Sequence, residues 1–266
     1  MRKLLQSGSF LIAGIFLFTS CEAWEDESYH EGGPGGIGGG LLLKEVKTTS
    51  DGVEGLATYS YDEQGRTKEV HTYSDILDME SYSHTVNTYT SSTNITTVSK
   101  IYAAGVVQST TTMTTQMSGN NVHISSETEY EFAGEIILIN SDNDMTFSAP
   151  CGVSENIVTL EMPEMPVQEH TLTYEYTDEN CSSKEFQDGE LTVTTTMDAN
   201  FSPYTTTESI AMGIIPHNPL KIESALDGTI ETITYTYNEE GYPTKAVHTF
   251  NEGSGQADYT EEFTYY

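Results

Sequence analysis

The sequence predicts an all-β, mainly antiparallel protein: an open or closed barrel or half-barrel of roughly a dozen strands, with a β-sandwich as the alternative. From residue 41 onward Thr, Tyr, Val and Ile dominate, and these residues suit a pleated, half-buried surface. Residues of one kind also recur at every second position, as expected for strands. The alternation is clear in the windows 95–99, 172–176, 191–197 and 233–237. Turn signals fall between such windows, at 51–52, 63–65, 119–121, 227–228 and 239–241.

The first twenty residues have the layout of a secretory signal. A positive start at residues 2–3, an apolar core at 10–18 and two small residues at 19–20 precede Cys21. The apolar run is too short for a membrane-spanning helix, which needs about 20 residues. The layout resembles a bacterial lipoprotein signal, and this resemblance implies cleavage before Cys21 and acylation of its thiol. A plain cleaved signal with an incidental cysteine is the alternative.

Residues 21–40 are predicted to form a tether between the lipid and the folded domain. Acidic residues follow Cys21 closely, and a glycine-rich run from Gly32 to Gly40 cannot bury apolar surface. A phosphate-binding glycine loop is disfavoured, because no strand precedes the run and no Lys-Ser or Lys-Thr pair follows it. The early acids resemble the surface-export signals of Bacteroidetes lipoproteins, which implies an outer-membrane lipoprotein at the cell surface. The periplasmic face is the alternative.

The chain is strongly acidic, with a formal net charge of −31 at pH 7. Removing the signal takes away two basic residues and no acidic one, which leaves Arg66 as the only arginine. Such a chain lacks the cationic surface that phosphate backbones require, so we expect no nucleic-acid partner. No calcium-binding loop motif is present, and we predict neither a metal site nor a cofactor.

Residues 41–266 are predicted to form a single domain that begins and ends with the same β-meander. The segments 43–73 and 220–250 match each other, with Pro243 as a one-residue insertion, and each predicts three strands joined by two tight turns. The two copies could form the two ends of one sheet or face each other across a sandwich. In this alignment His71 and His248 occupy the same position.

These repeated segments carry a resemblance to a known group of proteins. The first copy contains the motif Tyr-x-Tyr-Asp-x-x-Gly-Arg, which begins at Tyr59. The second contains Tyr-x-Tyr-Asn-x-x-Gly-Tyr-Pro-Thr-Lys, which begins at Tyr235, and residues 218–221 lead into this copy. They resemble the hairpins of uncharacterised lipoproteins from gut Bacteroidetes, which have domains of unknown function. The resemblance covers the signal and the two ends of the domain, while residues 75–215 match by composition only. It implies a porin-like or half-barrel antiparallel fold and brings no established activity.

At most one or two short helices are expected. The best candidate runs from Ser202 to Met212, where Ser202 and Pro203 could serve as the N-cap and first helical residue and Gly213 could end the helix. The run of threonines from 205 to 207 disfavours a helix there.

Cys151 and Cys181 are the only cysteines besides Cys21. In an exported chain an even pair predicts a disulfide, with two free buried thiols as the alternative. The segment that the bridge would close contains Met162-Pro163-Glu164-Met165-Pro166, which is unsuited to a central strand. We expect this segment to be an excursion pinned at its base by the bridge.

No catalytic residue is predicted. The histidines do not have metal-site spacing, and a metal joining His71 and His248 is disfavoured against two ordinary sheet histidines. A Gly-x-Ser-x-Gly elbow is absent. Carboxylate pairs are weak indicators in a chain with 41 acidic residues.

The function predicted is that of a non-enzymatic, membrane-anchored binding protein. Its ligand could be a glycan, a small lipid-like molecule or an envelope protein. The candidate ligand-binding residues are Tyr59, Tyr61, Tyr235 and Tyr237. Two alternatives are a polysaccharide hydrolase that uses paired carboxylates and a structural or adhesive surface protein that associates through an edge strand.

Overall fold

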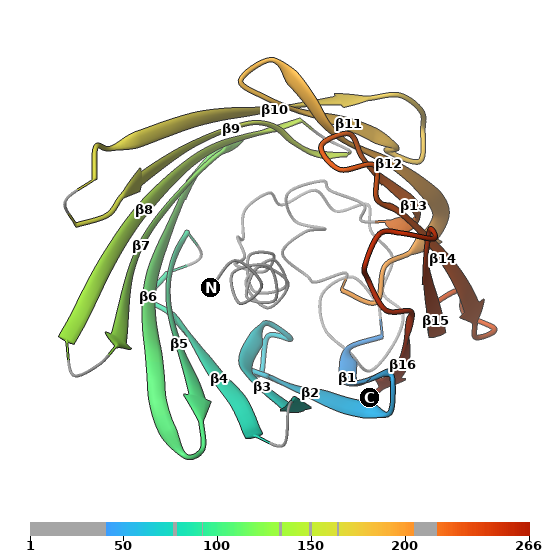
Figure 1. Cartoon of the computed structure of the whole chain (residues 1–266), viewed down its shortest axis with the longest axis horizontal. Coiled ribbons are helices and arrows are strands. Elements are labelled where there is room, and N and C mark those ends of the chain that lie inside the picture. Colours follow the sequence, from blue (N-terminus) through green and yellow to red (C-terminus); the bar gives the residue numbers. More distant parts are fainter. Residues whose placement is uncertain are drawn as a thin grey trace.

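The structure is a computed structural model in which a closed antiparallel barrel contains all the described strands (Figure 1). The described residues are 41–76, 79–91, 93–132, 135–148, 151–163, 165–204 and 217–266. Sixteen strands lie within these ranges, and each pairs with its neighbours in sequence. The ring closes where β1 pairs with β16.

The strands are long, and the strand bounds are as follows. They are β1 (Leu43–Ser50), β2 (Val53–Tyr61), β3 (Thr67–Ile76), β4 (Met79–Tyr89), β5 (Asn94–Ala103), β6 (Val106–Ser118), β7 (Asn121–Phe132), β8 (Glu135–Ser148), β9 (Gly152–Glu161), β10 (Gln168–Tyr176), β11 (Ser183–Gln187), β12 (Glu190–Phe201), β13 (His217–Ser224), β14 (Ile230–Tyr237), β15 (Pro243–Phe250) and β16 (Tyr259–Tyr265). The all-β antiparallel prediction is confirmed, and the closed barrel replaces the sandwich alternative.

Several parts of the sequence prediction fall outside the described residues. These are the signal, Cys21 and the tether, together with most of the expected helix. Ser202 to Tyr204 form a turn after β12, and residues 205–216 are not described. Within the described part of the chain, no helix has the length and apolar character needed to cross a membrane.

Side chains alternate between the two faces of the barrel wall, because successive residues of a strand point in opposite directions. On β14, Ile233 is buried while Thr232, Thr234 and Thr236 are exposed. Ile233 packs in the core cluster with side chains of β1, β15 and β16, so the exposed threonines face away from this core. We call the surface on which these threonines lie the outer wall, and the opposite surface the inner wall. The pairing register extends both walls from strand to strand.

The outer wall is mostly polar. Threonines face outward along β14, and on β7 the outward residues are His123, Ser125, Glu127, Glu129 and Glu131. The inner wall of β3 to β8 also carries many hydroxyls, and these pair across strands: Thr72 with Ser83 at 2.6 Å and Ser126 with Ser141 at 2.9 Å. Polar residues on both walls hide the usual alternation, which explains why the sequence indicated fewer strands.

The apolar core lies on the inner wall where the barrel closes. Leu43 and Val46 of β1 pack with Ile233, Ala246 and Phe263 of β14, β15 and β16. Tyr204, which follows β12, packs edge-on against Phe263 with ring centroids 6.3 Å apart. Burying each large apolar side chain contributes roughly 1.5–3 kcal/mol, so this cluster stabilises the closing strand pair.

The two related meanders are neighbours in the barrel, separated only by β16. The first copy forms β1 to β3 and the second forms β13 to β15. Their second turns match: the N–H of Asp62 donates to the carbonyl of Arg66 at 2.9 Å, as that of Asn238 does to the carbonyl of Tyr242 at 2.9 Å. The copies therefore form the two ends of one closed sheet rather than facing sheets.

The register corrects the alignment of the two histidines. Tyr59 pairs with Val70, and Tyr235 pairs with Ala246, so the third strands correspond without an insertion. His71 then faces outward, while His248 faces inward, because a shift of one residue moves a side chain to the other face. A metal site joining His71 and His248 is excluded by this geometry.

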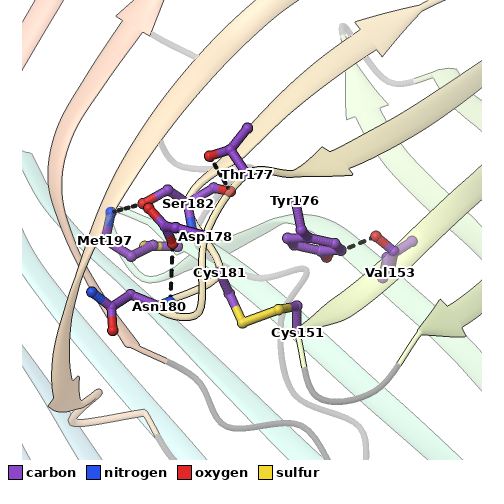
Figure 2. The surroundings of a disulfide bond; sticks show 9 residues. All are labelled: Cys151, Val153, Tyr176, Thr177, Asp178, Asn180, Cys181, Ser182 and Met197. Carbon is purple, nitrogen blue, oxygen red and sulfur yellow. Dashed lines mark hydrogen bonds between the residues drawn. A yellow bond between two sulfur atoms is a disulfide. The ribbon is translucent and has the colours of Figure 1, made fainter.

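Cys151 and Cys181 form a disulfide at one end of the barrel, and their Cα atoms are 5.2 Å apart (Figure 2). Cys151 lies between β8 and β9, and Cys181 lies between β10 and β11. Most of the segment between them forms β9 and β10, two regular strands of the wall, and only its proline-containing part connects them. The expectation of an excursion was therefore wrong.

Hydrogen bonds hold the backbone around the disulfide in place. The Tyr176 hydroxyl donates to the carbonyl of Val153 at 2.8 Å, and the Asp178 carboxylate accepts from the N–H groups of Asn180 and Ser182 at 3.0 Å each (Figure 2). The bonds from Ser182 hold the pKa of Asp178 below its usual range. These contacts position the two ends of the bridge.

Removing the disulfide should destabilise the barrel. The bridge spans a sequence separation of 30. Loss of this constraint on the unfolded chain is expected to lower the free energy of unfolding by roughly 3–4 kcal/mol. Urea denaturation of the double variant Cys151→Ala, Cys181→Ala tests this, with Cys21→Ala as the control. Equal unfolding midpoints for the two proteins would contradict it.

Candidate functional site

Three outward tyrosines on neighbouring strands form the most distinctive feature of the outer wall. Tyr73 of β3 lies opposite Tyr82 of β4, which lies opposite Tyr102 of β5. The Tyr82 and Tyr102 rings stack with centroids 4.3 Å apart and an angle of 10° between their planes. We call Tyr73, Tyr82 and Tyr102 the tyrosine ladder.

Two members of the tyrosine ladder are exposed to solvent, and the third, Tyr102, is half-buried. Tyr73 is 42% exposed and Tyr82 is 37% exposed, and Leu56 of β2 continues the row beyond Tyr73. A contiguous row of aromatic groups on a mostly polar surface is a candidate binding site. The ladder could not be recognised in the sequence, because its members are far apart in the chain and only the strand register aligns them.

The four tyrosines predicted to bind ligand face the inner wall. Tyr59 and Tyr235 pack against the core cluster, and burial raises the pKa of both hydroxyls above its ordinary value. The Tyr61 hydroxyl donates to the carbonyl of Leu43 at 2.7 Å. The Tyr237 hydroxyl donates to the carboxylate of Asp198. These contacts assign all four side chains to packing and strand connection, and ligand binding by them stays a prediction.

A buried ion network occupies the inner wall beside this core. Nδ1 of His248 lies 2.6 Å from Oε1 of Glu231, and Nε2 lies 3.2 Å from Oε2 of Glu261. The imidazole stacks on the Tyr259 ring with centroids 4.0 Å apart, and its side chain is 7% exposed. Because both ring nitrogens face carboxylates, the network suits a doubly protonated imidazolium.

The two carboxylates raise the pKa of His248. Burial alone would lower this pKa, but hydrogen bonds from the ring to Glu231 and Glu261 outweigh burial and raise it to about 8. The value in the unfolded chain is about 6.5. A raised pKa in the folded state means that the network stabilises the fold fully below about pH 6.5 and loses this contribution as the pH rises through about 8.

The hydrolase alternative requires two carboxylates in one cleft, one of them a proton donor. Glu231 and Glu261 are the pair that His248 brings together, and both are engaged with the imidazole. The network connects β14, β15 and β16 through the His248 ring.

A separate open hollow of about 380 Å³ lies at the end of the barrel near the β6–β7 turn. Its lining includes Met117, Val122, His123 and Asp144. The ring nitrogen Nδ1 of His123 lies 2.8 Å from the Asp144 carboxylate. The hollow contains no tyrosine, so it lacks the aromatic lining expected of an apolar-ligand carrier.

The structure defines a closed all-β barrel with a polar outer wall. No protein-family model matches the chain, and no curated protein matches it. Among solved structures, a porin-like protein from Bacteroides uniformis ATCC 8492 is similar, with a TM-score of 0.53 and 14% identity over 84% of this chain and 96% of that chain. A porin-like protein from Bacteroides vulgatus ATCC 8482 gives a TM-score of 0.46 and 10% identity over 85% and 99% of the two chains. The first similarity supports the porin-like architecture expected from the hairpins, and it extends to the fold alone.

The pH dependence of stability tests the His248 network. From about pH 6 to about pH 9, the free energy of unfolding should fall by up to about 2 kcal/mol more in the wild type than in His248→Phe, which cannot titrate. Urea unfolding at a series of pH values measures this difference. Parallel pH profiles for the two proteins would show that His248 does not carry a raised pKa.

Proposed function

We propose that the protein is a lipid-anchored, non-enzymatic barrel of the bacterial outer envelope that binds a neutral glycan at the tyrosine ladder. The observation that carries the binding function is the register of Tyr73, Tyr82 and Tyr102 on three adjacent strands of a mostly polar wall. The anchor rests on the N-terminal signal and Cys21, followed by an acidic and glycine-rich tether.

The polar outer wall supports a barrel that stands in water beside the membrane. A barrel embedded in a bilayer presents an outward apolar band about 25 Å tall, flanked by aromatic girdles. Here the outward residues of β14 are threonines, and those of β7 are mainly glutamates. Placing this wall in hydrocarbon would leave hydroxyls and charges without water, which is costly. A lipid at Cys21 would hold such a water-facing domain at the membrane.

A neutral glycan fits the chemistry of the ladder. Sugar rings have apolar C–H faces that pack on aromatic rings and hydroxyls that bond to the tyrosine O–H groups. The net charge of −31 disfavours polyanionic polysaccharides. A lipid-like ligand would instead need an enclosed apolar cavity.

The adhesive alternative is disfavoured by closure of the barrel. Association through an edge strand requires unpaired N–H and C=O groups along that strand. Each of the sixteen described strands has a partner on both sides. Contacts with other molecules would therefore be made by side chains, and the ladder places three aromatic side chains next to one another on the outer wall.

The anchor is tested by replacing its attachment residue. Cys21→Ala should move the protein from the membrane fraction to the soluble fraction and abolish incorporation of a labelled fatty acid, because acylation requires the thiol. Fractionation and labelling of cells that express the two proteins measure this. The lipid anchor would be contradicted if the Cys21→Ala variant stayed in the membrane fraction and the wild type incorporated no labelled fatty acid.

Glycan binding is tested with purified protein and a panel of soluble neutral glucans and mannans. Each Tyr→Ala change at 73, 82 or 102 should weaken binding roughly twofold to tenfold, as expected for loss of one aromatic contact. The matched controls replace Thr232, Thr234 and Thr236 with alanine one at a time, so that each changes one outward side chain on another part of the wall. Affinity electrophoresis or calorimetry measures the affinities.

Two results would overturn the glycan proposal. One is the absence of binding to every neutral glycan of the panel. The other is binding that falls equally in the threonine controls. Capture of a protein partner that depends on the ladder would assign the same surface to an envelope protein instead.

A further inference from the structure

Two histidines and a glutamate meet on the outer wall, one row away from the tyrosine ladder. His71 of β3 lies opposite His84 of β4, and Glu69 precedes His71 by two residues on the same face. The two imidazoles stack with centroids 4.0 Å apart and an angle of 13° between their planes. Nitrogen and carboxylate donor atoms from two adjacent strands thus converge at one point, with all three donor atoms within 4.8 Å of one another.

Two of the three distances between donor atoms are longer than hydrogen bonds and close to the spacing of neighbouring zinc ligands. Oε2 of Glu69 lies 3.5 Å from Nε2 of His71 and 3.7 Å from Nε2 of His84. A hydrogen bond between such atoms spans about 2.7–3.2 Å. Zinc bonds of about 2.0–2.1 Å in tetrahedral geometry place neighbouring ligand atoms roughly 3.3–3.5 Å apart. The observed distances of 3.5 and 3.7 Å are close to this spacing between neighbouring zinc ligands.

One of the donor atoms lacks a partner. Nε2 of His84 is shielded from solvent and makes no hydrogen bond, although the side chain as a whole is 36% exposed. A shielded polar atom without a partner costs free energy, which a bound ligand would recover. The shielding of this atom from solvent adds to the donor spacing and points to the same place.

We propose that Glu69, His71 and His84 bind a zinc ion, with water as the fourth ligand. Two imidazoles and one carboxylate form a ligand set that zinc accepts, while calcium and magnesium prefer oxygen ligands alone. The lone pair of a ring nitrogen lies in the plane of its ring, and the two ring planes are nearly parallel. Binding of both nitrogens to one ion therefore requires a rotation of the rings about their Cβ–Cγ bonds. Both side chains are partly exposed, which leaves room for this rotation.

The local charges allow a cation at this site. Lys68 lies 3.5 Å from the other oxygen of Glu69, Oε1, and leaves Oε2 facing the histidines. Lys100 lies opposite His84 on β5 and opposes the cation, while the charge of −31 on the whole chain favours it.

Calorimetric titration of the purified full chain with zinc chloride tests the proposal. All samples carry Cys21→Ser, so that neither a lipid nor a free thiol contributes. We expect saturable binding with one zinc per chain. Loss of an outer-shell partner lowers metal affinity about 10-fold to 100-fold. His71→Asn and His84→Asn should each weaken the zinc affinity by more than this, because they remove a direct ligand. Glu69→Gln should also weaken it, because it removes the anionic ligand.

The matched control is His123→Asn, which removes another outer-wall histidine that also has a carboxylate neighbour, Asp144, at 2.8 Å. This variant should bind zinc as the parent does. Thermal unfolding without zinc checks that each variant is folded. In the parent protein, zinc should shift the ring resonances of His71 and His84 in NMR spectra and leave those of His123 unchanged, a readout that needs no ligand substitution.

The proposal is overturned if zinc leaves the His71 and His84 resonances unchanged. It is equally overturned if folded His71→Asn and His84→Asn variants bind zinc with the parent's affinity, or if His123→Asn loses binding to the same extent. The site does not depend on glycan binding, since it uses residues outside the tyrosine ladder. Failure of one proposal therefore leaves the other standing.

Discussion

Pairing of β1 with β16 is the constraint on which the rest of the structure depends. It turns a meander of sixteen strands into a ring without free edges and thereby defines an inner and an outer wall. The core cluster sits at this junction, where Val46 lies opposite Phe263. The two related meanders flank it, so the repeated sequence supplies matching surfaces on both sides of β16. Within the closed sheet, the register decides which residues meet, because each residue of a strand places its side chain on one wall only.

Much of the fold could be predicted from the sequence, because β-propensity and turn residues are local properties. The meander turns at Asp62 and Asn238 follow directly from their Asx and glycine residues. The strand number and closure could not be predicted, since hydroxyl residues on both walls of β3 to β8 remove the alternation that marks a strand. The repeat also gave a wrong correspondence. Sequence alignment of the two segments placed His71 and His248 at the same position, whereas the strand register places them on opposite walls.

The candidate sites were harder to predict, because they consist of residues brought together across strands. The tyrosine ladder and the zinc site both depend on the β3–β4 register, in which Tyr73 meets Tyr82 and His71 meets His84. These pairs are symmetric about the turn that joins the two strands, so a correctly placed turn would have revealed them. The sequence pointed instead to tyrosines of the repeated hairpins, such as Tyr61, whose hydroxyl is used to bond the backbone of β1.

Whether the outer wall faces water can be measured by a cysteine scan of β14 in membranes from expressing cells. The scan uses a water-soluble thiol reagent, with the unsubstituted chain as background. If the wall faces water, labelling should be fast at 232, 234 and 236 and slow at 233 and 235, because exposure alternates along this strand. Protection of the three threonine positions until detergent is added would place the wall in lipid instead.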